Sequence, residues 1–173
     1  MNCSLCGLVF LLLLFAWPAS SRAAERPAQP NIVLILADDL GAHDLGCYGA
    51  DLHETPHLDC LAREGICFTQ AYAPSPVCSP TRASMLTGKH PARLHITIWS
   101  EGALETPTNR MLLPATSLPD LPHHETTVAR YLQGAGYLTA LVGKWHLGNA
   151  DHYPETHGFH VNIGGTRWGA PAT

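Results

Sequence analysis

Two hydrophobic runs, each followed by polar residues, are the clearest pattern along the chain. Residues Asn31–Ala37 (NIVLILA) form a continuous aliphatic run that stops at Asp38 and Asp39. Residues Tyr137–Val142 (YLTALV) form a second run, which stops shortly before Lys144. Such β-branched and leucine-rich runs are typical of strands buried on both faces of a parallel sheet. The pattern therefore predicts two buried strands with charged side chains just beyond their carboxyl ends.

Capping residues and glycine stops predict three helices. A Ser or Thr followed by Pro, which suits an N-cap and a first helical position, occurs at Thr55–Pro56 and at Ser79–Pro80. The first pair begins a helix over 57–64, and the second begins a helix that ends near Thr87, before a glycine. A third helix is expected over 126–133. Helices that alternate with buried strands predict an α/β fold.

Two further segments are expected to contain no helix. Residues 66–73 suit an extended segment, whereas residues 99–124 have no clear hydrophobic period and are rich in Pro and Thr. The second segment is therefore predicted to be a long loop. The 15 glycines and 14 prolines among 173 residues agree with a chain that contains many turns.

The amino-terminal apolar stretch predicts an export signal and no stable membrane span. Residues Leu8–Trp17 supply about ten apolar residues, whereas a transmembrane helix needs roughly 20 and a signal about 7 to 15. Small residues at Ser21 and Ala23 suit cleavage after Ala23. No Lys or Arg precedes the run, and an uncleaved anchor or a buried helix is the alternative. We expect residues 1–23 to be a signal peptide, residues 24–30 to be a linker, and the protein to be secreted, periplasmic or otherwise exported.

Composition narrows the classes of function. Hydrophobic residues make up 46% of the chain and charged residues 14%, which excludes a disordered acidic tail. The formal net charge of −4 argues against nucleic acid as a partner. A length of 173 residues suits one modest domain.

Four of the six cysteines lie outside the expected signal peptide. These four contain no Cys-x-x-Cys pair, so their spacing argues against a zinc ribbon. If Cys78 is functional, Cys47, Cys60 and Cys67 either form one disulfide and leave one free thiol, or are three buried small hydrophobic residues. The sequence leaves their pairing open.

Two adjacent aspartates form the first of three groups of reactive side chains. Asp38 and Asp39 follow the first hydrophobic run, and ligands of open α/β sheets bind beyond the carboxyl ends of the strands. Adjacent buried carboxylates are costly unless a cation neutralises them, and oxygen ligands suit Ca²⁺ or Mg²⁺ rather than zinc. The alternative is a simple turn after the strand, with one aspartate capping a helix.

Cys78 and Arg82 form the second group. A helix N-terminus binds anions and stabilises a thiolate, which favours Cys78 as a nucleophile. Arg82 lies one turn later, and its side chain leans back toward the N-terminus, within reach of Cys78 or a bound anion. The alternative is a structural cysteine beside an ordinary helix cap.

Lys144 and His146 form the third group. They are two residues apart, so in an extended backbone both side chains point to the same side. An ammonium group and an imidazole would then lie over the same anion, and the alternative is a surface loop after the strand. Together the three groups predict a site for a metal ion and an oxyanion.

Four segments resemble sequences of the sulfatase family, in the family's order. PVCSPTRASMLTG, residues 76–88, resembles the first sulfatase signature, and GYLTALVGKWHLG, residues 136–148, resembles the second. NIVLILADDLG, residues 31–41, is similar to the metal-binding strand that opens the family's domain. TPHLDCLAREGICFTQAYA, residues 55–73, is similar to the segment between them. The chain therefore resembles a formylglycine-dependent sulfatase.

The resemblance implies an alkaline phosphatase-like α/β sandwich with a mostly parallel central sheet. In this family the cysteine that matches Cys78 is oxidised to formylglycine (3-oxoalanine) by a formylglycine-generating enzyme, which reads a pattern matched here by Cys78, Pro80 and Arg82. One hydroxyl of the hydrated aldehyde attacks sulfur, and the other expels sulfate from the formylglycine-sulfate intermediate. A plain serine or cysteine lacks that second hydroxyl. Asp38 and Asp39, with the modified Cys78, would bind Ca²⁺ or alternatively Mg²⁺.

The resemblance also implies roles for three other residues. Arg82 would orient the diol, Lys144 would bind the sulfate, and His146 would contact the substrate and assist proton removal as sulfate leaves. The reaction would be hydrolysis of an aryl or carbohydrate sulfate ester, so the partners would be a sulfated small molecule or glycan and the formylglycine-generating enzyme. A phosphoester or phosphonate hydrolase of the same superfamily is an alternative.

The sequence departs from the family's pattern after His146. Sulfatases of this family are longer, and they supply a further Asp and Asn to the metal, another His and another Lys from later positions. His152, His157 and His160 follow in this chain, but no matching Asp and Asn segment does. We therefore expect residues 31–173 to be the incomplete N-terminal part of a sulfatase catalytic domain, with a noncatalytic remnant as the alternative.

Two groups of side chains stay unassigned by these patterns. His123, His124 and Glu125 resemble a small metal cluster but also suit a solvated loop before a helix. The basic and aromatic side chains of residues 93–99 suit a substrate pocket or a long loop equally well.

Overall fold

A computed structural model describes residues 29–105, 108–109 and 111–170 of the chain. The expected signal peptide, residues 1–23, lies outside these ranges, as does the expected linker apart from its last two residues. None of the helices in the described ranges combines the length and the apolar character that a membrane crossing requires.

The first hydrophobic run is exposed and forms no strand, contrary to the prediction. The chain divides into two compact units, Met1–Ala37 and Asp38–Thr173, and Asn31–Ala37 closes the first. Its side chains face solvent, with 82% exposure at Val33 and 84% at Ile35. A strand buried on both faces needs hydrogen-bonded neighbours and covering layers. The described residues provide neither to this run, so its hydrophobic pattern alone does not form a strand.

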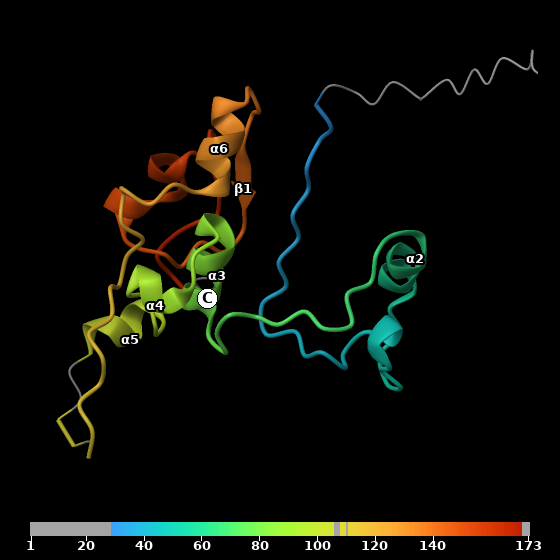
Figure 1. Cartoon of the computed structure of the whole chain (residues 1–173), viewed down its shortest axis with the longest axis horizontal. Helices are drawn as coiled ribbons and strands as arrows, with labels where there is room; N and C mark the ends of the chain where they lie inside the picture. Colours follow the sequence, from blue (N-terminus) through green and yellow to red (C-terminus); the bar gives the residue numbers. More distant parts are fainter. Residues whose placement is uncertain (1–28, 106–107, 110, 171–173) are drawn as a thin grey trace, which may run out of the picture. The chain divides into compact units, whose positions relative to one another are not determined.

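The second unit consists of short helices and a small sheet (Figure 1). In chain order its α-helices are α2 (Pro56–Glu64), α3 (Cys78–Thr87), α4 (Pro91–Leu94), α5 (Ser100–Leu104) and α6 (Val128–Gly134). Its 3-10 helices are η1 (Gly46–Tyr48), η2 (Ala150–His152) and η3 (Pro154–His157). Its strands are β1 (Ala140–Val142) and β2 (Val161–Ile163).

The three helices predicted from capping signals are present as α2, α3 and α6. Helix α6 begins two residues later than expected because Thr127 is its N-cap, and the Thr127 hydroxyl accepts a hydrogen bond from the Arg130 N–H at 3.2 Å. A cap of this kind contributes about 1 kcal/mol to helix stability. Helix α3 ends where Gly88 adopts a left-handed φ of 69°, as its glycine stop predicted.

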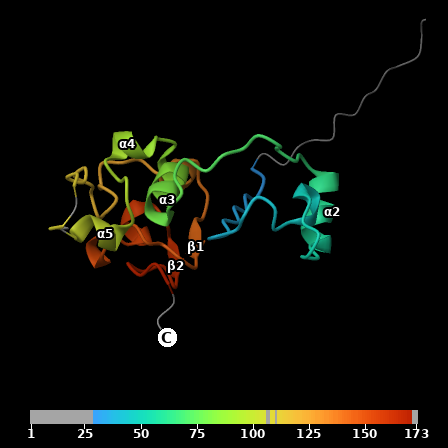
Figure 2. The same ribbon diagram turned by 90° about the horizontal axis from the view of Figure 1, so that it is seen from below.

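Strands β1 and β2 pair in parallel, and Figure 2 shows them side by side. Ala140 lies opposite Val161, and Val142 lies opposite Ile163. Strand β1 covers only the second half of the predicted strand over 137–142, and it is exposed at both of its ends instead of buried. Its ladder partner among the described residues is β2, so much of its surface lacks a covering neighbour.

A hydrophobic core fixes the segment after β1 against α3. Trp145 and Leu147 are each 1% exposed and alternate with the polar residues of the candidate site. Trp145 also donates a hydrogen bond from its indole nitrogen to the His152 carbonyl at 2.8 Å. The core contains Ala83, Leu94, Ile96, Leu121, Trp145 and Leu147. Burying one large apolar side chain contributes about 1.5–3 kcal/mol, so this cluster holds the site's backbone firmly.

Of the two segments that were expected to contain no helix, one contains a helix and the other does not. Residues 66–73 form no regular element and are exposed. The predicted loop over 99–124 contains helix α5, so that prediction was wrong for 100–104. Helix α5 begins at Ser100, whose buried N–H is held by a side chain 21 residues earlier, and such a tertiary contact leaves no local sequence pattern.

All four cysteines in the described part carry free thiols. Cys67 is exposed, so the interpretation of three buried small hydrophobic residues is wrong for it. Burial, followed by the nearby Cys67 and Asp59, raises the pKa of the Cys47 thiol. Cys47 is therefore protonated and weakly nucleophilic at neutral pH.

Candidate functional site

Helix α3 places Cys78 at its first position. Val77 is the N-cap, with extended backbone, and its side chain makes no capping hydrogen bond. The prediction of Ser79 as N-cap was therefore wrong by two residues. Pro80 is tolerated in this first turn because its missing N–H would have no partner within the helix. Cys78 is half-buried at a helix end whose N–H groups favour an anion.

The Ser79 hydroxyl holds this first turn in place instead of capping it. Ser79 is fully buried, and its hydroxyl donates to the His146 carbonyl at 2.8 Å. The same oxygen accepts a hydrogen bond from the Ser100 N–H at 3.1 Å. One side chain next to Cys78 therefore fixes α3 to the segment after β1 and to the start of α5.

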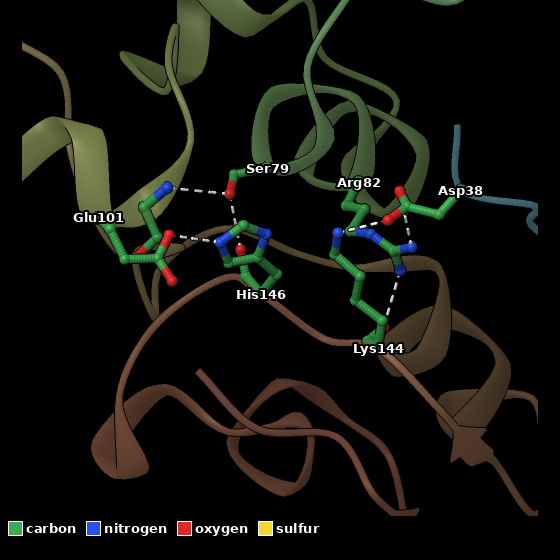
Figure 3. A network of polar contacts seen from close by, with 7 residues as sticks. Asp38, Ser79, Arg82, Glu101, Lys144 and His146 are labelled. Carbon is green, nitrogen blue, oxygen red and sulfur yellow. Dashed lines mark hydrogen bonds and ion pairs between the residues drawn. The ribbon is translucent and has the colours of Figure 1, made fainter. Parts of the chain in front are cut away.

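Arg82 lies one turn after Cys78 and joins α3 to two other segments (Figure 3). Its Nη1 donates to the Lys144 carbonyl at 2.7 Å, and its Nη2 lies 3.4 Å from Asp38 Oδ1. The side chain is only 11% exposed. Its Nε is buried and has no hydrogen-bond partner in the described part of the chain. The guanidinium thus retains its buried Nε–H for a further acceptor.

Asp38 contacts two cations at once. Lys144 Nζ bonds to Asp38 Oδ2, and Arg82 contacts Oδ1 (Figure 3). Partial burial raises the pKa of Asp38, but the hydrogen bond and charge of Lys144, followed by those of Arg82, outweigh it and leave the pKa below its ordinary value. The carboxylate is therefore ionised at neutral pH. Asp38, Arg82 and Lys144, which the sequence assigned to one site, therefore lie together.

The aspartates have the donor chemistry of a site for a hard cation. Asp39 is exposed, with φ at 58°, and its carboxylate makes no hydrogen bond or ion pair to another described residue. Carboxylate oxygens are ligands that Ca²⁺ and Mg²⁺ prefer. Asp38 is drawn toward Arg82 and Lys144, and within the described ranges no hydrogen bond links either aspartate to Cys78. The carboxylate donors fit the predicted ion, although Asp38 is at present paired with two cationic side chains.

His146 does not share a partner with Lys144, contrary to the prediction from their spacing. The backbone at His146 has a left-handed φ of 59°, so this segment is not extended. The His146 side chain is 4% exposed, and its Nε2 lies 2.6 Å from Glu101 Oε2 (Figure 3). The two side chains therefore reach different carboxylates, Lys144 that of Asp38 and His146 that of Glu101.

Glu101, on α5, is a site residue that the sequence did not indicate. An ionised carboxylate only accepts hydrogen bonds, so in a neutral His146 ring Nε2 would carry the proton and Nδ1 the lone pair. Nδ1 is buried and has no partner within the described residues. Burial raises the pKa of Glu101, but the hydrogen bond from His146 and further favourable contacts outweigh it, so the pKa is lowered. The pair leaves His146 one ring nitrogen that can accept a proton.

The adjacent residues His123, His124 and Glu125 do not form one cluster. The buried Glu125 carboxylate lies 2.5 Å from Lys89 Nζ and 3.5 Å from His124 Nε2. His123 instead stacks on His152, with ring centroids 4.2 Å apart. Of the two interpretations left open for these three neighbours, a single metal cluster made of all three is therefore not what the structure shows.

Known proteins that are similar to this chain are sulfatases. The sulfatase family model matches residues 30–170. Human steryl-sulfatase is 45% identical over 162 residues, which cover 90% of this chain and 26% of that protein. Human arylsulfatase A is 45% identical over 149 residues, which cover 84% of this chain and 27% of that protein. The chain spans about a quarter of the length of these curated relatives.

A solved structure shows the same fold. The crystal structure of Ps i-CgsB in complex with k-i-k-neocarrahexaose matches with a TM-score of 0.62 and 32% identity, covering 79% of this chain and 28% of the other. The predicted α/β class is therefore confirmed, and the described elements form part of the alkaline phosphatase-like fold of sulfatases. With 141 residues matched by the family model between positions 30 and 170, this chain belongs to the sulfatase family.

Proposed function

We propose that the protein carrying this chain is a formylglycine-dependent sulfatase that hydrolyses an aryl or carbohydrate sulfate ester. The observation that carries the proposal is the contact of Arg82 and Lys144 with Asp38, one helical turn from Cys78. The relatives are named steryl-sulfatase and arylsulfatase, and the similar crystal structure contains k-i-k-neocarrahexaose. These names support sulfate esters of ring-containing alcohols or sugars as the substrate class.

Cys78 has the surroundings that an activated nucleophile needs. When formed from Cys78, formylglycine supplies a hydrated aldehyde with one hydroxyl to attack sulfur and a second to expel sulfate. The first turn of α3 offers unpaired N–H groups to the negative charge that develops there. Ser79 keeps this turn in position through its two hydrogen bonds. Asp38 and Asp39 are the residues that would hold Ca²⁺, or alternatively Mg²⁺, beside it.

Arg82 and Lys144 supply positive charge for the sulfate group. Both side chains are largely buried, at 11% and 20% exposure, so solvent screens their charges less than it would on the open surface. Preorganised cations that face a developing negative charge stabilise the transition state. Arg82 is fixed through the Lys144 backbone carbonyl, and both cationic side chains also contact Asp38.

His146 is suited to accept a proton through Nδ1. Glu101 binds Nε2–H and thereby fixes the ring orientation and the tautomer. Nδ1 is buried and unpartnered in the described part of the chain, and a buried acceptor of this kind favours a ligand that donates a hydrogen bond. Proton transfer to a positioned base typically accelerates a reaction by about 10² to 10⁴.

The substrate class can be tested with matched chromogenic esters. We expect turnover of an aryl sulfate and much weaker turnover of the corresponding aryl phosphate, by protein coexpressed with a formylglycine-generating enzyme. Mass spectrometry of the tryptic peptide that contains Cys78 should show an aldehyde instead of a thiol. A preference for the phosphate ester would favour a phosphoester hydrolase, and no turnover by protein with modified Cys78 would favour a noncatalytic remnant.

Replacing Glu101 by glutamine is expected to reduce kcat by about tenfold or more with little change in KM. The neutral amide can donate to Nε2 of His146 instead of accepting from it, which selects the wrong tautomer. The ¹⁵N spectrum of the His146 ring should then change from Nε2-protonated toward Nδ1-protonated.

Glu105→Gln is the matched control for this prediction, because Glu105 follows the same helix and is exposed. It should leave both kcat and the imidazole spectrum unchanged. An unchanged tautomer of His146 in the Glu101 variant would refute the positioning role, even if activity fell.

A further inference from the structure

Three histidines gather outside the site described above. His123 precedes α6, His152 ends η2, and His157 ends η3. Each offers one ring nitrogen, and these three nitrogens all lie within 4.8 Å of one another. The rings of His123 and His157 are nearly parallel, with centroids 5.4 Å apart. Three segments that are separate in the sequence therefore bring three imidazole donors to one place.

His152 is already held in the orientation of a metal ligand. Its Nδ1 lies 2.8 Å from the Leu121 carbonyl oxygen, which only accepts hydrogen bonds. In the neutral ring Nδ1 therefore carries the proton, which leaves the lone pair on Nε2. A histidine that binds a metal through one nitrogen almost always donates its other N–H to a carbonyl or carboxylate in this way.

His157 is the second observation that points to a ligand. It is fully buried, and neither of its ring nitrogens has a hydrogen-bond partner in the described part of the chain. Buried polar atoms are nearly always satisfied, so an unpaired imidazole among other imidazoles calls for an occupant.

The donor set selects the class of ion. Imidazole nitrogens suit Zn²⁺, Cu²⁺ and Ni²⁺, whereas Ca²⁺ and Mg²⁺ take oxygen ligands. We propose that His123, His152 and His157 form a binding site for a divalent transition-metal ion, best represented by Zn²⁺. This site is separate from the oxygen-rich site assigned to Asp38 and Asp39, and it does not rest on the proposed sulfatase activity.

The geometry needs one adjustment, and one side chain is free to make it. Zinc lies about 2.0–2.1 Å from each histidine nitrogen, so its ligand atoms lie closer together than 4.8 Å. His123 is exposed, and its ring is held by stacking on the rings of His152 and His157 and by no hydrogen bond to another described residue, so it is the ring that can turn most readily. His152 and His157 are the more constrained pair, because one is hydrogen-bonded and the other is buried.

The remaining charged group at the cluster does not block the site. Arg130 donates from Nη1 to the His123 carbonyl at 2.9 Å and from Nη2 to the Thr156 carbonyl at 2.6 Å. Its guanidinium is thereby committed to the backbone on both sides of the cluster. It opposes a cation electrostatically, but it also fixes the segments that carry His123 and His157. Sites with three neutral histidines and a bound water hold Zn²⁺ in other proteins.

The cluster also contacts the core beneath the candidate active site. The Trp145 ring centroid lies 5.5 Å from that of His157, and the Trp145 indole donates to the His152 carbonyl. Trp145 is flanked in sequence by Lys144 and His146. A bound ion would therefore tie three loops to the backbone that carries these site residues, which gives the ion a structural role.

Zinc titration of the full chain tests the site, with thiols alkylated and Ca²⁺ in excess to remove the cysteines and aspartates as competitors. We expect saturable Zn²⁺ binding by calorimetry and a metal-dependent rise in Tm. His123→Ala should weaken binding by about tenfold or more, since a ligand is lost. Because His123 is exposed, this variant keeps the fold, which circular dichroism without metal will verify.

His124→Ala is the matched control, because His124 is the neighbouring residue and its side chain is 78% exposed. It should bind Zn²⁺ with wild-type affinity and show the same rise in Tm. Co²⁺ gives a second readout, since histidine ligation produces visible absorption that the His123 variant should lose. Absence of saturable binding by folded wild-type protein, or equal affinity of the two alanine variants, would overturn the proposal.

Discussion

Replacing Cys78 by alanine is expected to abolish hydrolysis of sulfate esters. The proposed reaction passes through an oxygen nucleophile formed at this residue, and alanine provides none. Removal of a nucleophile leaves only the contribution of substrate binding and electrostatics, so kcat should fall by at least about three orders of magnitude. Steady-state turnover of an aryl sulfate, with unfolding curves for both proteins, measures the effect.

Cys78→Ser tests the role of the second hydroxyl separately from that of the attacking hydroxyl. Serine can attack sulfur once, but its sulfate ester has no neighbouring hydroxyl to expel the sulfate. We therefore expect a single burst of product and a serine peptide that gains the mass of one SO₃ group. Continued turnover by the serine variant would contradict the proposed elimination step.

Cys60→Ala is the matched control for both cysteine variants. Among the described residues, the hydrogen-bond partner of the Cys60 thiol is Glu64 of the same helix, at 3.3 Å. Its replacement should leave kcat unchanged. Substantial residual activity in the Cys78→Ala variant would show that the nucleophile lies elsewhere in the protein.

Replacing Arg82 by methionine is the second prediction with a large effect. The change removes the guanidinium but retains most of the apolar stem. The Lys144 carbonyl loses its donor at 2.7 Å, and Asp38 loses one of its two cations. Losing a charged hydrogen bond at a largely buried site should cost about 2 kcal/mol in the free energy of unfolding. Loss of a preorganised positive charge should also lower kcat by about 10² to 10³.

Urea unfolding and steady-state kinetics measure these two effects independently. Arg63→Met is the matched control, because Arg63 is an exposed arginine on α2. Its effect on stability should stay within about 0.5 kcal/mol, and its kcat should match the wild type. If Arg82→Met retained wild-type kcat with only reduced stability, Arg82 would have a structural role alone.

Features encoded by local sequence were predicted well. Helix α2 begins at its Thr–Pro pair, and α3 ends at Gly88, because caps and glycine stops act within one turn. Asp38, Arg82 and Lys144 also meet as expected, although the run before Asp38 forms no strand, so the strand-end argument does not account for their meeting. Motif resemblance then supplied the chemistry that these positions alone left open.

Features that depend on distant partners were not predictable. Glu101 pairs with His146 across 45 residues of sequence, and nothing in its surrounding loop marks it. Ser79 is a residue type that often caps helices. Its hydroxyl is buried instead, where it bonds to the His146 carbonyl and the Ser100 N–H. Asn31–Ala37 has the pattern of a buried strand, but burial is a property of its neighbours as well as of its own side chains.

At His146 the left-handed backbone lowers stability, whereas the side chain is the proton acceptor of the proposed reaction. Its φ of 59° is held by two tertiary hydrogen bonds, since its N–H donates to the Thr166 carbonyl at 3.0 Å and its carbonyl accepts from Ser79. A non-glycine residue in this conformation costs about 1 kcal/mol or more. Glycine would relieve that strain while removing the imidazole. In the proposed reaction, this position therefore combines a strained backbone with a fixed imidazole, and tertiary hydrogen bonds offset the cost of the strain.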